Sequence, residues 1–286
     1  MKLPIVSLTV AALAALAASV LAAEPAETIP LWPDGNPGGW SVEGEENWIE
    51  KGDGIDRVEN INEPALLYFP PAEAADARDA AIIICPGGGY NILAFNHEGT
   101  LVADFFASEG FHAFVLKYRL PRTGDEPRHA VPLEDARRAI ALVREGAEER
   151  HIATDKIGIM GFSAGGNLAA HAAASPTGES DRPDFCGLIY PAYLLAEGSE
   201  TEVAEILQPT KDSPPTFFIH AENDPIPVEG SLALYRALKK LEIPAEAHFF
   251  AAGGHGYGIT KATDLPVGQW PALMAAWMKG LTADSP

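Results

Sequence analysis

KIGIMGFSAGGNLAAHAAA (residues 156–174) places one serine, Ser163, among glycines where an apolar run gives way to an alanine-rich run. The apolar run predicts a buried strand and the alanine-rich run a helix. A serine on such a sharp turn has a strained backbone, and only small neighbours avoid the adjoining strand and helix. The stretch therefore predicts a reactive hydroxyl at the edge of a sheet, although glycine-rich turns also serve packing or phosphate binding.

From residue 80 onward, short apolar runs alternate with longer amphipathic ones. This alternation is typical of βα units around a mostly parallel sheet, so we predict the α/β class with a central sheet flanked by helices. The expected strands are residues 80–85, 113–118, 156–161, 186–191, 215–220 and 245–250. The expected helices are residues 101–109, 132–151, 164–174, 229–241 and 267–279.

The Ser163 hydroxyl needs a base to take its proton and a third group to orient that base. Asp224 follows one expected strand, and His255 lies in a glycine-rich loop after the next. The chain order Ser163, Asp224, His255 puts all three on loops at the same sheet edge. Glu222 is the alternative acid. The alternative bases are the remaining histidines, His97, His112, His129, His151, His171, His220 and His248.

CPGGGY (residues 85–90) follows the first strongly apolar strand and predicts donors for a developing oxyanion. Consecutive glycines let backbone N–H groups approach a substrate that side chains would block. We expect Gly88 and Gly89 to donate, together with Ala164 at the positive end of the helix after the serine. A phosphate-binding loop is the alternative, but the Gly-Lys-Ser/Thr that continues a P-loop is missing.

Several polar residues lie beside these motifs. Tyr90, Asn91 and Asn167 are our candidates for substrate contacts. Glu98, in the NHEG stretch, is expected to brace the glycine loop or cap the following helix, with direct substrate contact by His97 or Glu98 as the alternative. Asp135 is likewise expected to brace or cap. No cluster of His, Cys, Asp and Glu has metal-ligand spacing, and the dinucleotide fingerprint is absent, so no metal or cofactor is expected.

The chain has 286 residues, 47% of them hydrophobic, which suffices for one large core. Its net charge of −20 argues against nucleic acid or an anionic membrane surface as a partner. Lys2 precedes an uncharged, alanine-rich run that predicts a signal peptide over residues 1–23 and export to the periplasm or medium. A membrane anchor is the alternative, but so much alanine is weakly hydrophobic, and no stable anchor is expected.

We predict an N-terminal arm over residues 24–63 and a catalytic domain over residues 64–286. Residues 29–48 of the arm are rich in Pro, Gly and acidic residues and are expected to be irregular. Its tryptophans are expected to pin it to the domain, with stacking on sugar rings as the alternative. Cys85 and Cys186 are expected to be buried thiols at opposite edges of the sheet, beyond disulfide distance.

PGGGY with HEG after it, GFSAGGNLA, PPTFFIHAENDPIPVEGS and GGHGYG together resemble exported bacterial α/β-hydrolases of the acetylxylan esterase and feruloyl esterase type, relatives of the hormone-sensitive-lipase group. The likeness begins near residue 64, and IPLWPDG resembles the mature start of such proteins. It implies the α/β-hydrolase fold and a serine esterase that removes small acyl groups, most often acetyl, from polysaccharides or their oligomers. By position it assigns Ser163, Asp224 and His255 as the triad and the PGGGY glycines as oxyanion donors.

One segment departs from this family. Residues 192–213 form a shorter insertion than many relatives carry after the corresponding strand. We therefore expect little or no cap domain and an open site, which suits an acylated oligosaccharide or polysaccharide. Two alternatives stay open, namely a general short-chain carboxylesterase without sugar preference and a non-catalytic carbohydrate-binding protein on the same fold.

Overall fold

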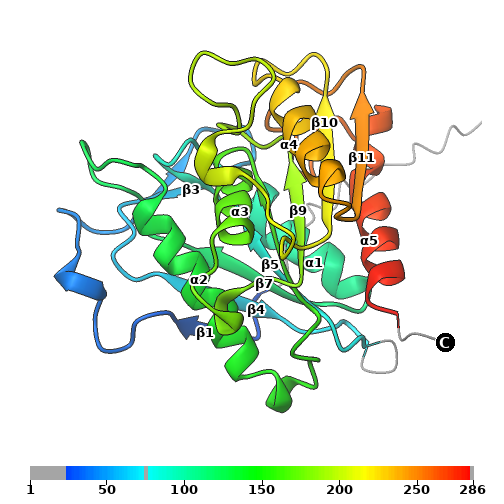
Figure 1. The fold of residues 1–286 in the computed structure, drawn as a ribbon. Coiled ribbons are helices and arrows are strands. Elements are labelled where there is room, and N and C mark those ends of the chain that lie inside the picture. Colours follow the sequence, from blue (N-terminus) through cyan, green and yellow to red (C-terminus); the bar gives the residue numbers. More distant parts are fainter. Residues whose placement is uncertain (1–23, 74–76, 284–286) are drawn as a thin grey trace, which may run out of the picture.

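The computed structural model of the chain describes residues 24–73 and 77–283, which are built around an eight-stranded sheet (Figure 1). The strand order is β1-β4-β7-β5-β8-β9-β10-β11. Strands β7 to β11 in this order run parallel to one another, whereas β4 is antiparallel to both β1 and β7. The bounds of these strands are β1 (Glu27–Pro30), β4 (Ala65–Phe69), β5 (Ala81–Cys85), β7 (His112–Lys117), β8 (Ile157–Phe162), β9 (Phe185–Ile189), β10 (Thr216–Ala221) and β11 (Ala245–Phe250).

Helices cover both faces of the sheet. Figure 1 shows α2, α3 and α4 on one face and α1 and α5 on the other. Their bounds are α1 (Leu101–Ser108), α2 (Ala130–Glu145), α3 (Ala164–Ala174), α4 (Glu229–Lys240) and α5 (Trp270–Leu281). Together with the sheet they confirm the predicted α/β class with a mostly parallel central sheet.

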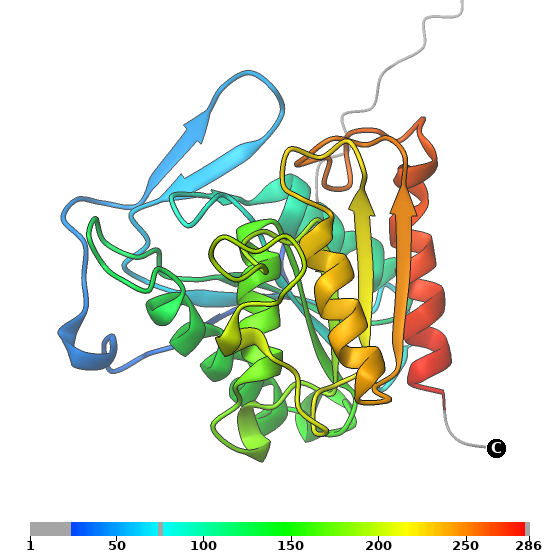
Figure 2. The ribbon, with the colours of Figure 1, turned by 45° about the horizontal axis from the view of Figure 1, so that its top comes forward.

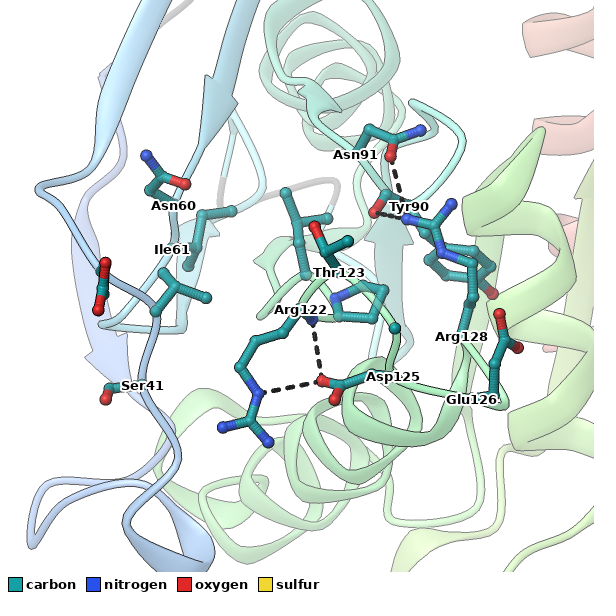
Figure 3. Close-up of a pocket in the computed structure, with 15 residues that line it drawn as sticks. Ser41, Asn60, Ile61, Tyr90, Asn91, Arg122, Thr123, Asp125, Glu126 and Arg128 are labelled. Carbon is teal, nitrogen blue, oxygen red and sulfur yellow. Dashed lines mark hydrogen bonds and ion pairs between the residues drawn. The ribbon is translucent and has the colours of Figure 1, made fainter.

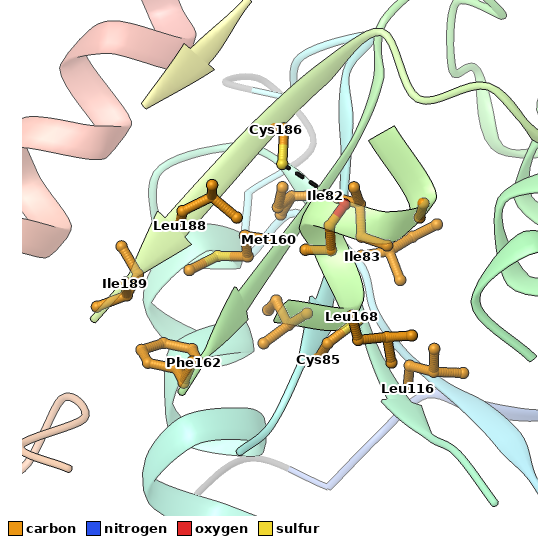
Figure 4. Close-up of a cluster of buried hydrophobic side chains, with 14 of the residues drawn as sticks. Ile82, Ile83, Cys85, Leu116, Met160, Phe162, Leu168, Cys186, Leu188 and Ile189 are labelled. Atoms are coloured by element: carbon orange, nitrogen blue, oxygen red, sulfur yellow. Dashed lines mark hydrogen bonds between the residues drawn. The ribbon is translucent and has the colours of Figure 1, made fainter. Parts of the chain in front are cut away.

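The central strands are apolar because both of their faces are covered. Every residue of β5, β8 and β9 is buried, as expected for parallel strands between two layers of helices. Aliphatic and sulfur-containing side chains from these strands pack against α3 (Figure 4). This rigid centre ends in the turn that carries Ser163.

Cys85 and Cys186 are buried free thiols, as predicted, but not at opposite edges of the sheet. They lie in β5 and β9, on either side of β8, opposite Gly161 and Ile159 respectively. Two strand spacings alone amount to about 9.5 Å, and an offset of two residues along β8 adds to the separation, whereas Cα atoms joined by a disulfide lie at most about 7 Å apart.

Most predicted elements agree with the structure to within two residues, but two helices differ at one end. α2 stops at Glu145 instead of residue 151, and a 3-10 turn, Glu148–Arg150, follows Gly146. α5 begins at Trp270 instead of residue 267, because Pro266–Gln269 form a 3-10 turn first. Pro271 suits the first turn of α5, where no N–H is needed.

The arm, residues 24–63, contains three strands. They reach into the stretch predicted to be irregular, residues 29–48, only at residues 29–30 and 47–48. That prediction is confirmed for residues 31–46, where a 3-10 turn, Pro37–Gly39, lies between stretches without helix or strand. β1 extends the main sheet, while β2 (Asn47–Glu50) and β3 (Asp56–Glu59) form a second sheet with β6 (Leu93–Ala94). Figure 2 shows the β2–β3 hairpin standing out from the body of the molecule. β2 and β3 pair with each other, whereas β1 pairs with β4 and β3 with β6, two strands outside the arm that its local composition does not reveal.

Two tryptophans of the arm act as anchors. The Trp32 indole N–H donates to Oδ1 of the fully buried Asp135 at 2.7 Å. The Arg119 guanidinium, which also binds Asp135, lies over the rings of Trp32 and Trp40 at 5.8 and 5.2 Å from their centroids. Trp48, in contrast, is 51% exposed. Asp135 therefore ties the arm to α2 and to the loop after β7.

The segment between β9 and β10, all of which the structure describes, forms no cap domain over the sheet edge. There the chain forms an isolated bridge, Leu195 with Val203, and a 3-10 turn, Glu205–Leu207. Among residues 24–73 and 77–283, the helices are too short or too polar to cross a membrane. The predicted signal peptide, residues 1–23, lies outside the described residues.

Candidate active site

Ser163 lies on the turn between β8 and α3 with a strained backbone. Its φ of 51° and ψ of −116° fall in a region that residues with a side chain rarely adopt. A Cβ on Gly161 would lie 2.0 Å from the carbonyl oxygen of Gly165, and a Cβ on Gly165 would lie 2.1 Å from that of Cys85. Glycine at these two positions is therefore a steric requirement of the turn.

The structure brings Ser163, His255 and Asp224 within hydrogen-bonding distance of one another. His255 Nε2 lies 2.8 Å from Ser163 Oγ, and His255 Nδ1 lies 2.8 Å from Asp224 Oδ2. With its proton on Nδ1 and facing the carboxylate, the neutral imidazole presents Nε2 as an acceptor for the serine hydroxyl. Glu222, the alternative acid, is exposed on the same loop.

The Asp224 carboxylate is buried but well supplied with donors. Its side chain is 0% exposed, and Oδ1 accepts the Ile226 N–H at 2.7 Å. Burial alone would raise the pKa of this carboxyl, but the nearby His220 imidazole and hydrogen bonds with His255 and Ile226 hold the pKa below its ordinary value. Asp224 is therefore an anion that can orient and stabilise a protonated His255.

His220 contacts Asp224 as a second imidazole and has a role that the sequence did not indicate. It is fully buried in β10, with Nε2 3.4 Å from Asp224 Oδ2 and Nδ1 2.9 Å from Ser231 Oγ. In the sequence it was one of several alternative bases. Its contact with the carboxylate instead makes it a positioning residue for Asp224.

The glycine loop after β5 is braced by Glu98, as the sequence predicted. Gly87 N–H donates to Glu98 Oε2 at 2.8 Å, and the Tyr190 hydroxyl donates to Glu98 Oε1 at 2.7 Å. The same Tyr190 hydroxyl accepts the Gly258 N–H at 2.8 Å. One buried carboxylate thus couples the glycine loop to the loop that carries His255.

The predicted oxyanion donors have N–H groups available. Gly88 and Gly89 have positive φ values of 137° and 63°, which glycine adopts far more readily than residues with a side chain. In the part of the chain that the structure describes, neither N–H takes part in a hydrogen bond. Ala164 is the first residue of α3, so its N–H has no acceptor within the helix.

Two of the three predicted substrate contacts are largely buried and bonded to each other. Tyr90 and Asn167 are each 3% exposed, and the Tyr90 hydroxyl donates to Asn167 Oδ1 at 2.8 Å. This bond holds the glycine loop against α3, and contact of either residue with substrate stays a prediction. Asn91 is exposed, donates to the Gly89 carbonyl at 3.0 Å and accepts from Arg128 at 3.0 Å.

His129 and His171 stack beside the site, with ring centroids 3.6 Å apart and planes at 19°. Burial lowers the pKa of His171 to about 3, and the neighbouring His129 and Arg137 contribute to this shift. Burial also lowers the pKa of His129. Both imidazoles are therefore neutral in the folded protein at pH values where the unfolded chain already binds protons.

We expect this pair to make stability depend on pH. Because a histidine with a depressed pKa binds fewer protons when folded, the free energy of unfolding should fall as pH drops from about 6.5 toward 4, by up to about 1.4 kcal/mol per pH unit for each such group. His171→Phe keeps a ring without the charge, so its unfolding free energy should fall less over this range. Guanidinium titrations at several pH values measure this, with His151→Asn, at an exposed position, as the control. Parallel pH curves for wild type and His171→Phe would contradict the expectation.

No metal-binding cluster accompanies these groups. Within residues 24–73 and 77–283, no three His, Cys, Asp or Glu side chains are grouped so that they could hold a metal ion. The nucleophile, base, acid and backbone donors described above are a set that needs no cofactor for acyl transfer.

Comparison with known proteins gives the same class. Residues 82–209 match a family model described as the alpha/beta hydrolase fold. A solved structure of an acetyl ester-xyloside bifunctional hydrolase from Caldicellulosiruptor lactoaceticus is 30% identical, with a TM-score of 0.67, and the match covers 90% of this chain and 97% of that one. The chain therefore belongs to the α/β-hydrolase family.

Two curated relatives match a shorter part. Endo-1,4-beta-xylanase B of Butyrivibrio fibrisolvens is 33% identical over 217 residues, which are 66% of this chain and 34% of the relative. An acetylxylan esterase of Xylanibacter ruminicola is 30% identical over 203 residues, 63% of this chain and 41% of the relative. The chain thus matches only about a third to two fifths of the length of these relatives.

Proposed function

We propose that this protein is a serine esterase that hydrolyses short acyl esters, acetyl above all, on carbohydrates. The observation that carries the proposal is the hydrogen-bonded series from Ser163 Oγ through His255 to Asp224, with 2.8 Å at each step. The series lies beside unpaired backbone N–H groups at an open sheet edge. Nucleophile, base, orienting acid and oxyanion donors are the parts that ester hydrolysis requires.

In the first half of the proposed reaction, Ser163 Oγ attacks the ester carbonyl carbon while its proton passes to His255 Nε2. The C=O π electrons move onto the oxygen. The resulting oxyanion accepts hydrogen bonds from the backbone N–H groups of two or more of Gly88, Gly89 and Ala164. The tetrahedral intermediate collapses by breaking the bond to the sugar oxygen. His255 gives its proton to that oxygen, so the sugar leaves as an alcohol and Ser163 keeps the acyl group.

In the second half, water attacks the acyl carbon and gives a proton to His255. Collapse of the second intermediate returns that proton to Ser163 Oγ and releases the carboxylic acid. Asp224 stays ionised throughout and stabilises the imidazolium that forms twice per cycle. Atoms and charges balance without a metal or other cofactor.

Two observations support a carbohydrate substrate. The site has no cap, so a chain longer than the acyl group has room at the sheet edge. Proteins similar to this one carry names that refer to acetylxylan or to acetyl esters and xylosides. Export to the periplasm or medium, where such polymers occur, is part of the same proposal.

Acetate release from a panel of substrates tests the proposal. We expect release from acetylated xylan and acetylated oligosaccharides, and a decline in rate along the series from acetyl to longer acyl esters of p-nitrophenol. Turnover of aryl esters with no release from any sugar ester, acetylated sialic acid included, would favour a general short-chain carboxylesterase. Failure on every ester would leave the non-catalytic carbohydrate-binding alternative.

A further inference from the structure

Two adjoining hollows open beside the glycine loop that follows β5. The first, which we call the inner hollow, has a volume of about 460 Å³ and is lined by Gly89, Asn167 and Tyr193 among others. The second, the outer hollow, has a volume of about 890 Å³ and lies between the arm and residues 120–128. Tyr90, Glu126 and Arg128 line both hollows, which therefore adjoin along this wall.

Tyr193 connects the inner hollow to the nucleophile. The N–H of Ala192, the residue before it, donates to the carbonyl oxygen of Ser163 at 2.9 Å. The Tyr193 hydroxyl also lies 4.0 Å from the position that a Cβ on Gly89 would occupy. The backbone directly before Tyr193 thus contacts the serine turn, and the Tyr193 hydroxyl lies near the glycine loop.

The conformation of Tyr193 is costly and needs a reason. The residue is 60% exposed, and its φ of 56° is unfavourable for a bulky side chain. The ring stacks on Tyr90 with centroids 6.5 Å apart, and Asn167 donates to the Tyr193 carbonyl at 3.2 Å. Strain held by such contacts is concentrated at functional sites, and a fixed, exposed ring is a platform on which a flat apolar face can stack.

The outer hollow offers hydroxyl, amide and charged groups. Figure 3 shows Ser41 and Asn60 facing residues 122–128 across it. Arg122 forms an ion pair with Asp125 at 3.2 Å, and Arg128 donates to the Tyr90 carbonyl at 2.8 Å. Glu43 and Glu126 also line the hollow, so its acids are at least as numerous as its cations. Such a lining suits an uncharged ligand with many hydroxyl groups and does not attract an anion.

We propose that the two hollows bind a neutral oligosaccharide chain. Tyr193 stacks on a sugar ring adjoining the acetylated residue, and the outer hollow binds sugar residues farther along the chain. The inference rests on the proposed function and adds to it that acetylated oligomers are preferred over acetylated monosaccharides. Tyr193 is the specificity-determining residue of this preference.

Kinetics of Tyr193 variants test the stacking. For Tyr193→Ala we expect the ratio of kcat/KM on acetylated xylotetraose to kcat/KM on p-nitrophenyl acetate to fall about tenfold, a typical loss for one stacked ring. Tyr193→Phe should keep the wild-type ratio. Phe249→Ala, which removes another partly exposed ring on β11, is the matched control and should also keep the ratio. An unchanged ratio in Tyr193→Ala would overturn the inference.

Binding without chemistry separates this inference from the proposed function. Calorimetric titration of Ser163→Ala protein with unacetylated xylotetraose should show binding at least about tenfold tighter than with xylose, because the chain occupies both hollows. Adding Tyr193→Ala, or Ser41→Trp to fill the outer hollow, should weaken tetraose binding about tenfold. Equal binding of xylose and xylotetraose would overturn the inference and leave the esterase proposal intact. Tighter binding of an acidic oligogalacturonate would also overturn it, whereas tetraose binding by a protein that hydrolyses no sugar ester would contradict only the proposed function.

Discussion

Replacing Ser163 with alanine is expected to lower kcat for p-nitrophenyl acetate by about 10⁴-fold or more. The change removes Oγ, the atom that lies 2.8 Å from His255 Nε2, and leaves no nucleophile at the turn. Alanine keeps the Cβ, so the substitution adds no backbone strain at φ 51° beyond that of the wild type. Steady-state rates at saturating ester, with circular dichroism to verify the fold, measure the effect.

A matched serine and a covalent probe make this result specific. Ser108→Ala removes an exposed hydroxyl at the end of α1 that donates to the local Phe105 carbonyl, and its rate should stay at the wild-type level. A fluorophosphonate should label wild type with one group per chain and leave the Ser163→Ala protein unlabelled. A Ser163→Ala protein with near-wild-type turnover would rule out the assignment of Ser163 as nucleophile.

Replacing Asp135 with alanine is expected to reduce the free energy of unfolding by about 3–5 kcal/mol, because it leaves the buried Arg119 charge without its main partner. Asp135 accepts the Arg119 backbone N–H at 2.8 Å, the guanidinium at 2.7–3.0 Å and the Trp32 indole N–H at 2.7 Å. Its loss should also release the arm, which forms one side of the outer hollow. Guanidinium chloride titration measures the stability change.

The control comes from the neighbouring residue. Glu134 also binds Arg119, at 3.1 Å, but its side chain is 52% exposed. Glu134→Ala should therefore cost about 0–1 kcal/mol, as exposed ion pairs do. If both variants lost the same free energy of unfolding, burial would not be what makes the Arg119–Asp135 pair contribute more to stability than the exposed pair.

The chemistry of the site was largely readable from the sequence because it depends on local steric rules. Glycines at 161 and 165 mark a turn that admits no Cβ at either position, and this steric rule singles out Ser163 within a stretch of a few residues. Asp224 and His255 follow strands that were recognisable by hydrophobicity, and in a parallel sheet such positions meet at one edge. The brace from Glu98 to the glycine loop was likewise expected.

Other roles depended on neighbours that no local pattern specifies. Tyr90 and Asn167 hydrogen-bond each other across 77 residues of sequence, a contact that neither motif indicated. His220 was one histidine among several until β10 placed it against Asp224. Neither residue type nor spacing distinguishes a side chain that faces solvent from one that faces a buried partner.

The sequence by itself determined the α/β class, the serine turn and the order of the three interacting residues. These follow from hydrophobic periodicity and from glycine geometry, which act over a few residues. Only the tertiary structure decided that the arm joins two sheets, that Asp135 anchors it, and that the Tyr193 hydroxyl lies near the glycine loop. These features arise where segments distant in the chain pack together, since burial and partners are properties of the folded whole.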